Sequence, residues 1–181
     1  MVVIAAIVAV GTVAAFTAQG RVTNVITTGT VKITLNDETI VGSSPWGGIT
    51  GVMPGKPIDR IVTVTNGGTG DAWIRAKIDT TVTPADSGEK ELSSSLVIIN
   101  GTDDNWIYAD GYYYYKLPVH SSTKTSDLIK TVELDENVGN EYQNCTIRIN
   151  ITAQAVQVKN NDKVTVLTAE NYSAILGWPM V

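Results

Sequence analysis

The chain has very few of the residues from which most catalytic and metal sites are built. Among its 181 residues there are one cysteine, Cys145, and one histidine, His120. A single cysteine cannot form a disulfide within the chain, and a single histidine excludes the two-histidine zinc motif of metallopeptidases. The sequence also lacks a Gly-x-Ser-x-Gly elbow and a glycine-rich phosphate loop before a helix. We therefore expect no catalytic residues, no metal and no cofactor.

Positive charge is also scarce. The 13 Lys and Arg residues are outnumbered by 18 Asp and Glu residues, which gives a net charge of -5. Binding to nucleic acid or to an anionic membrane surface depends on clustered basic residues. We expect neither as a partner.

Long apolar runs are absent except at the N-terminus, where residues 2–15 are almost all apolar. A membrane-spanning helix needs roughly 20 apolar residues, whereas this length is typical of the apolar region of a signal peptide. We predict a signal peptide over residues 1–14, with cleavage at Ala14 and Ala15. No Lys or Arg precedes the run, whereas a signal peptide usually has basic residues there. The alternative is an apolar helix retained in the folded protein, as in a pilin stalk, although a pilin would usually also have a basic leader and a Glu just inside the apolar segment.

The remainder is rich in Thr, Val, Ile, Gly and Asn, which favour strands and tight turns over helices. Val31, Ile33 and Leu35 alternate with polar residues, the pattern of a strand with one buried face. Asp110-Gly111 supplies the positive φ angles of a tight hairpin turn. Further strands are predicted at 59–65 and 72–78, joined as a hairpin by 66–71, and at 96–99, 106–108, 112–117 and 145–155, the last a long inner strand.

These strands predict an all-β fold, with residues 31–181 forming one antiparallel β-sandwich of jelly-roll or immunoglobulin-like type. Only the C-terminus departs from the pattern. Thr168 can cap a short helix over residues 169–176, which Gly177 would end.

Each residue with potential chemistry also has a simpler interpretation. Cys145 is a buried apolar side chain or a nucleophile, and His120 is a solvated loop residue or a general base. The four tyrosines at 112–115 pack in the core and across the hairpin, or offer a platform for a sugar or a subunit. The carboxylates are solvated turn charges or calcium ligands. They are Asp103, Asp104, Glu133, Asp135 and Glu136.

Several short stretches, in this order and spacing, resemble the TasA, CalY and camelysin group of exported Gram-positive proteins, and they cover most of the chain. They are Ala14 to Thr17, Val22 to Asn24, Gly29 to Leu35, Val52 to Gly55, Val62 to Asn66, Ala72 to Ala76 and Asp110 to Lys116.

The resemblance implies a jelly-roll domain, processing by a SipW-type signal peptidase, and assembly with itself into biofilm-matrix fibres at the cell surface. Other matrix or cell-wall components are further candidate partners. It also implies donor-strand complementation, in which the N-terminal segment of one subunit completes the sheet of the next.

The residues at 15–30 suit that role, because this segment is β-prone and nearly uncharged. Main-chain hydrogen bonds to an open sheet edge would supply affinity, and alternate side chains would fill pockets. The donor residues are Phe16, Val22, Asn24, Val25 and Ile26. The alternative is an ordinary first strand within the same subunit.

Two other functions stay open. Camelysin is described as a metallopeptidase, although a single histidine argues against a zinc site here. A monomeric surface adhesin or carbohydrate-binding module could use Trp46, Trp73 or exposed tyrosines.

Overall fold

The computed structural model describes residues 22–24, 31–38, 51–85 and 90–179. The predicted signal peptide, with Ala14 and Ala15, lies outside these ranges. So do Phe16, Val25 and Ile26 of the predicted donor strand, whereas Val22 and Asn24 lie inside them.

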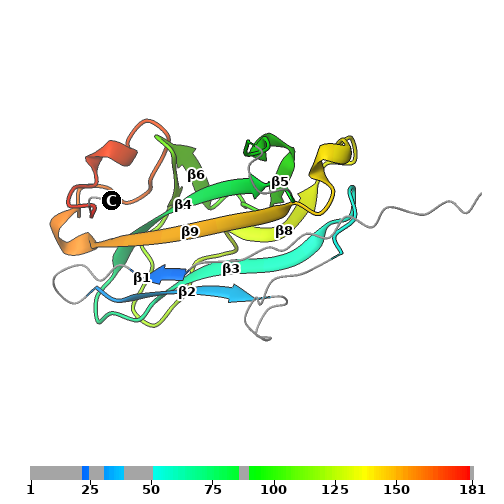
Figure 1. The fold of residues 1–181 in the computed structure, drawn as a ribbon. Coiled ribbons are helices and arrows are strands. Elements are labelled where there is room, and N and C mark those ends of the chain that lie inside the picture. Colours follow the sequence, from blue (N-terminus) through cyan, green and yellow to red (C-terminus); the bar gives the residue numbers. More distant parts are fainter. Residues whose placement is uncertain (1–21, 25–30, 39–50, 86–89, 180–181) are drawn as a thin grey trace, which may run out of the picture.

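The described residues form two β-sheets that pack face to face (Figure 1). One sheet has the order β1-β9-β4-β7-β6 and the other has the order β2-β3-β8-β5. All neighbours are antiparallel except β1 and β9. This arrangement confirms the all-β sandwich. The strands are β1 (Val22–Asn24), β2 (Ile33–Glu38), β3 (Ile58–Asn66), β4 (Ala72–Thr83), β5 (Val97–Asn100), β6 (Trp106–Ala109), β7 (Tyr112–Tyr115), β8 (Ile129–Leu134) and β9 (Thr146–Gln157).

The main core lies between the two sheets and is largely aliphatic. Val31, Ile33 and Leu35 are buried, while Lys32 and Thr34 between them are exposed, as the alternation predicted. Ile147, Ile149 and other inward residues of β9 meet this layer from the opposite sheet. Burial of these apolar faces supplies the main stabilisation of the sandwich.

The predicted hairpin at Asp110-Gly111 is confirmed. β6 and β7 pair from Trp106 opposite Tyr115 to Ala109 opposite Tyr112. Asp110 and Gly111 have φ values of 48° and 79°. Positive φ at both central residues matches the twist of the flanking strands.

The predicted hairpin between 59–65 and 72–78 is wrong, although both strands exist. β3 belongs to the four-stranded sheet and β4 to the five-stranded sheet, so the loop between them crosses from one layer to the other. The buried Asn66 side chain holds this crossing, because its Nδ2 donates to the carbonyls of Gly70 and Val119 and its Oδ1 accepts from the Gly68 amide. Turn residues predict a reversal of the chain but do not indicate which sheet receives the next strand.

Two further differences concern β8 and the C-terminus. β8 was not predicted, although Ile129, Val132 and Leu134 on it are buried. In place of a helix over 169–176 there is one 3-10 turn, Tyr172–Ala174. The segment instead spreads over the outer face of the five-stranded sheet, where Leu167 and Ile175 are buried against Trp73 and Tyr114.

The other 3-10 turns are equally short. They are Ser94–Leu96, Asn140–Tyr142 and Val158–Asn160. Within the described ranges, no helix has the length and apolar character needed to cross a membrane.

Candidate functional site: the edge of strand β9

The two sides of β9 are paired to very different extents. On one side, all twelve of its residues are in register with β4, from Thr146 opposite Thr83 to Gln157 opposite Ala72. On the other side, β1 is in register with only Ile151, Thr152 and Ala153. Within the described residues, no other strand lies on that side. Among the described residues, this twelve-residue inner strand is thus covered along one side by a strand of three residues.

The β1 pairing also differs in kind. It is parallel, with Val22 opposite Ile151 and Asn24 opposite Ala153. Parallel pairing is slightly less stable per residue than antiparallel pairing, and three residues offer few hydrogen bonds. Such an edge is a template on which another extended segment can pair.

A buried ion pair lies beside this edge. Arg60 of β3 is fully buried, and its Nε and Nη2 donate to Oδ1 and Oδ2 of Asp37 on β2, at 3.0 and 2.7 Å. The same Nη2 also donates to the carbonyl of Ile149, at 3.3 Å. Ile149 lies two residues before the stretch of β9 that β1 covers. The guanidinium therefore ties both sheets together next to the edge.

Sequence reasoning missed this pair, although a trace of it was visible. Arg60 occupies an inward position in the otherwise apolar alternation of β3, next to a shift in the register of β3 against β8. A charged residue at such a position requires a buried partner, because an isolated buried charge is very costly. The sequence does not show that the partner is Asp37.

Cys145 and His120 do not form a catalytic pair. Cys145 is fully buried and directly precedes β9, and burial raises the pKa of its thiol to about 11. A thiol with so high a pKa is not a nucleophile at neutral pH. His120 is exposed near the other end of the sandwich, with Nδ1 at 2.9 Å from Oδ2 of Asp71. Cys145 therefore behaves as a small apolar core residue.

The candidate calcium ligands are dispersed. Partial burial tends to raise the pKa of Asp103, but hydrogen bonds from Ser126 Oγ and from the amide and side chain of Asn105 hold it below its usual value. Asp135 instead accepts from the amide and side chain of Asn137. Across the described residues, no three His, Cys, Asp or Glu side chains come close enough to hold a metal ion. Both aspartates act as loop caps.

The tyrosine run does not form an open platform. Tyr113 and Tyr115 pack against the main core, while Tyr114 and Tyr112 face the C-terminal segment. Rings also pack against each other across the hairpin, with the centroids of Tyr108 and Tyr113 4.9 Å apart and their planes tilted by 54°. Of these residues only Tyr108 is largely exposed.

The outer face of this sheet is closed in the same way. The Arg75 guanidinium lies 3.9 Å from the ring centroid of Tyr112 and 4.6 Å from that of Trp178. Trp73, one of the candidate sugar-binding residues, is fully buried there, and Trp46 lies outside the described residues. Trp73 therefore cannot contact a ligand at the surface.

The edge of β9 is thus the feature of the described residues that most needs a functional explanation. Comparisons with family models, with curated proteins and with solved structures find no match to this chain.

Proposed function

We propose that this chain is an exported structural subunit of an extracellular fibre, related to the TasA and camelysin group, whose sandwich has jelly-roll topology. Subunits would assemble head to tail by donor-strand complementation once the signal peptide is removed. The donor is the N-terminal segment with Phe16, Val22, Asn24, Val25 and Ile26, and the acceptor is the edge of β9 in the next subunit.

One observation carries the proposal: among the described residues, β9 is paired over its full length on one side and over three residues on the other. An incoming extended segment can add main-chain hydrogen bonds along that edge. The donor and the acceptor are different surfaces of the subunit. An assembly of any length therefore keeps one free donor at one end and one free acceptor at the other, so it grows as an open filament.

In the single chain, β1 lies on its own β9, as an ordinary first strand would. The proposal requires this short pairing to be exchanged for the same pairing between neighbours. Exchange of an identical element costs little, since the same residues pair again across the junction between two subunits. Removal of the leader would release the donor and act as the assembly switch.

The peptidase and adhesin alternatives have less support. The described residues bring together no set of metal-ligating side chains, and Trp73 is buried. No observation favours either alternative over a structural subunit.

Intermolecular cross-linking tests the proposal directly. Val22→Cys and Ile151→Cys would be made as separate variants of residues 15–181, each with Cys145→Ser, and then mixed and oxidised. These positions are register partners, so neighbouring Cβ atoms would be within reach of a disulfide. We expect covalent dimers in the mixture and filaments by electron microscopy. The matched control pairs Val22→Cys with Lys77→Cys, on β4, a strand with which β1 does not pair.

Deletion of Phe16 to Asn24 should abolish filaments while circular dichroism shows that the sheets remain folded. The proposal fails if the truncated chain still polymerises. It also fails if oxidation joins residues 22 and 151 only when both cysteines are in the same molecule.

A further inference from the structure

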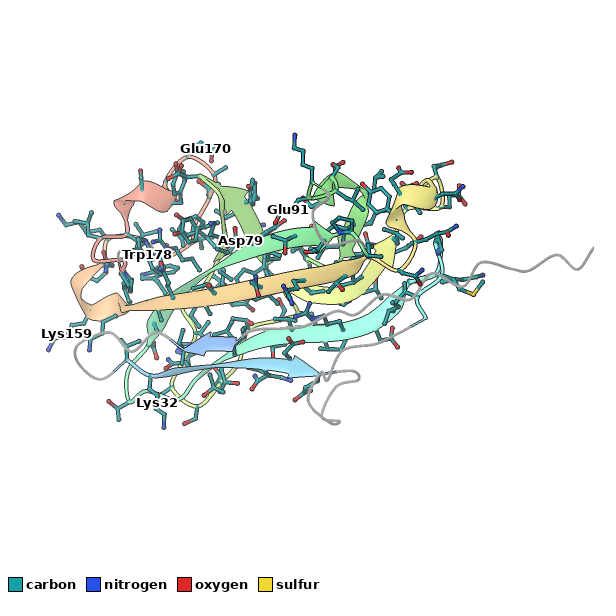
Figure 2. All side chains as sticks on the ribbon, viewed as in Figure 1. Lys32, Asp79, Glu91, Lys159, Glu170 and Trp178 are labelled. Carbon is teal, nitrogen blue, oxygen red and sulfur yellow. The ribbon has the colours of Figure 1, made fainter. Side chains whose placement is uncertain are left out.

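Exposed lysines gather at one end of the sandwich. Lys32 precedes β2, and its carbonyl accepts from the Gly67 amide just beyond β3. Lys124 is bridged to Thr65 near the end of β3, and Lys159 follows the end of β9. Figure 2 shows Lys32 and Lys159 at the same end of the molecule. We call Lys32, Lys124 and Lys159 the basic end.

The opposite end carries exposed carboxylates. Asp59 is the second residue of β3, Glu136 follows β8, and Glu141 lies in the 3-10 turn Asn140–Tyr142 before β9. Glu136 lies against the loop at Gly55, whose amide donates to the carbonyl of Leu134. We call Asp59, Glu136 and Glu141 the acidic end.

Each end also contains charges of the other sign, so the difference between the ends is one of net charge. At the basic end, Asp71 contacts His120, and Asp162 is adjacent to Lys163 in sequence. Glu170 lies on the C-terminal segment (Figure 2), and Lys56 follows Gly55, whose amide donates to Leu134 at the acidic end.

The salt bridges within the described ranges are Arg60–Asp37, Lys77–Asp79 and His120–Asp71. None of the six residues that define the two ends takes part in one of them.

We propose that the basic end of one subunit docks on the acidic end of the next, the partner being a second copy of this chain. This inference rests on the proposed fibre function and adds how subunits find each other and which way they face. Head-to-tail stacking brings unlike ends together and keeps like ends apart. Like-charge contacts would disfavour the reversed, head-to-head arrangement.

The attachment point of the donor agrees with this arrangement. The donor residues 16–26 are joined to the sandwich through residue 31, which directly precedes Lys32 of the basic end. A donor that leaves its own β9 therefore remains attached at the basic end. The neighbour on that side presents its acidic end, so strand exchange and charge pairing would act at the same junction.

Exposed charges act mainly on the rate at which subunits meet. Steering by complementary surfaces raises association rates by about 10-fold to 1,000-fold, and this gain falls as salt is added. The screening length is about 10 Å at 0.1 M salt and about 3 Å at 1 M. Growth of the fibre should therefore be fast at low salt and slower at high salt.

Charge reversal at the two ends tests the inference in residues 15–181. One variant carries Lys32→Glu, Lys124→Glu and Lys159→Glu, and the other carries Asp59→Lys, Glu136→Lys and Glu141→Lys. Each alone should polymerise at least about 10-fold more slowly at 20 mM salt, by light scattering. An equimolar mixture, and one chain carrying all six changes, should regain most of the rate.

A control places charge reversals on the sheet faces, away from both ends and from β9, with Lys77→Glu in β4 and Lys130→Glu in β8. This variant should polymerise close to the parent rate. The inference is overturned if the control slows growth as much as the end variants do, or if neither the mixture nor the six-fold variant recovers while circular dichroism shows intact sheets.

The same experiment separates this inference from the proposed function. Loss of filaments on deletion of Phe16 to Asn24, with no effect of charge reversal, would leave the fibre function standing and remove the docking inference. If the parent chain forms no filaments but the mixed variants associate in sedimentation velocity, the fibre function is wrong and the docking of opposite ends holds. If neither happens, both are wrong.

Discussion

The two edges of the five-stranded sheet are built in different ways. At one edge, β6 is joined to β7 by a two-residue turn, pairs with it over four positions, and packs its rings of Trp106 and Tyr108 against Tyr115 and Tyr113 of β7. At the other edge, β1 pairs with β9 over three positions, in parallel. The first edge is held by contacts close in sequence. The second edge depends on contacts between segments that are far apart in the chain.

This difference in pairing indicates which edge can exchange its strand with another molecule. A tight hairpin re-forms readily because its loop is short. A strand from another molecule could replace β6 beside β7 only by competing with this intramolecular pairing. β1 is not joined to β9 by a short loop, so its pairing lacks this stabilisation. We therefore regard the β9 side as the exchangeable edge and the β6 side as the fixed edge.

The largest effect is expected from the ion pair beside the β9 edge. Asp37→Ala leaves the Arg60 guanidinium buried without its carboxylate, which should lower the free energy of unfolding by about 3–5 kcal/mol. Urea denaturation followed by fluorescence measures this change. Asp79→Ala, which removes the solvent-exposed pair with Lys77, should leave the denaturation midpoint nearly unchanged. Equal shifts in the two variants would show that Arg60 does not depend on Asp37.

A proline at each edge gives the next largest effect. Ile107→Pro in β6 removes a main-chain donor from the fixed edge, and we expect a loss of about 2–3 kcal/mol. Thr23→Pro in β1 should cost less than about 1 kcal/mol, because three pairs can open locally without unfolding the sheets. The same Thr23→Pro variant should nevertheless block filament growth. A Thr23→Pro variant as unstable as Ile107→Pro would contradict the distinction between the two edges.

The smallest effect is expected at the hairpin turn. Gly111→Ala places a side chain at a φ of 79° with no atom within 4 Å of the new Cβ, so the cost is backbone strain alone, about 1 kcal/mol. Gly70→Ala is the control, since that site is equally open and has no positive φ. Thermal unfolding of the two variants should differ by several degrees. No difference would mean that the turn does not fix the β6 edge.

Local sequence features predicted the strands well. Alternation located β2 and β9, and Asp110-Gly111 located the β6–β7 hairpin, because each depends on residues close in the chain. The same reasoning joined β3 to β4 and missed β8. Which sheet a strand enters depends on the packing of two layers, and the decisive contacts, such as those of Asn66 with Gly70 and Val119, extend to distant residues.

The candidate site was predicted in part. The β-prone segment before residue 30 pointed to a donor, and Val22 and Asn24 of that segment do lie in a strand. The edge of β9, the ion pair between Arg60 and Asp37 and the segregation of charge to the two ends were not predicted. Each of these features combines residues from separate strands, so no local pattern identifies it.

The sequence by itself determined that this protein is built of strands and that a long inner strand lies near residue 150. The tertiary structure alone decided how those strands are divided between two sheets, and that β9 is covered along only part of one side by the residues that the structure describes. The physical reason is that the period of a strand is set by its own backbone, whereas its partners are set by which apolar faces can be buried together.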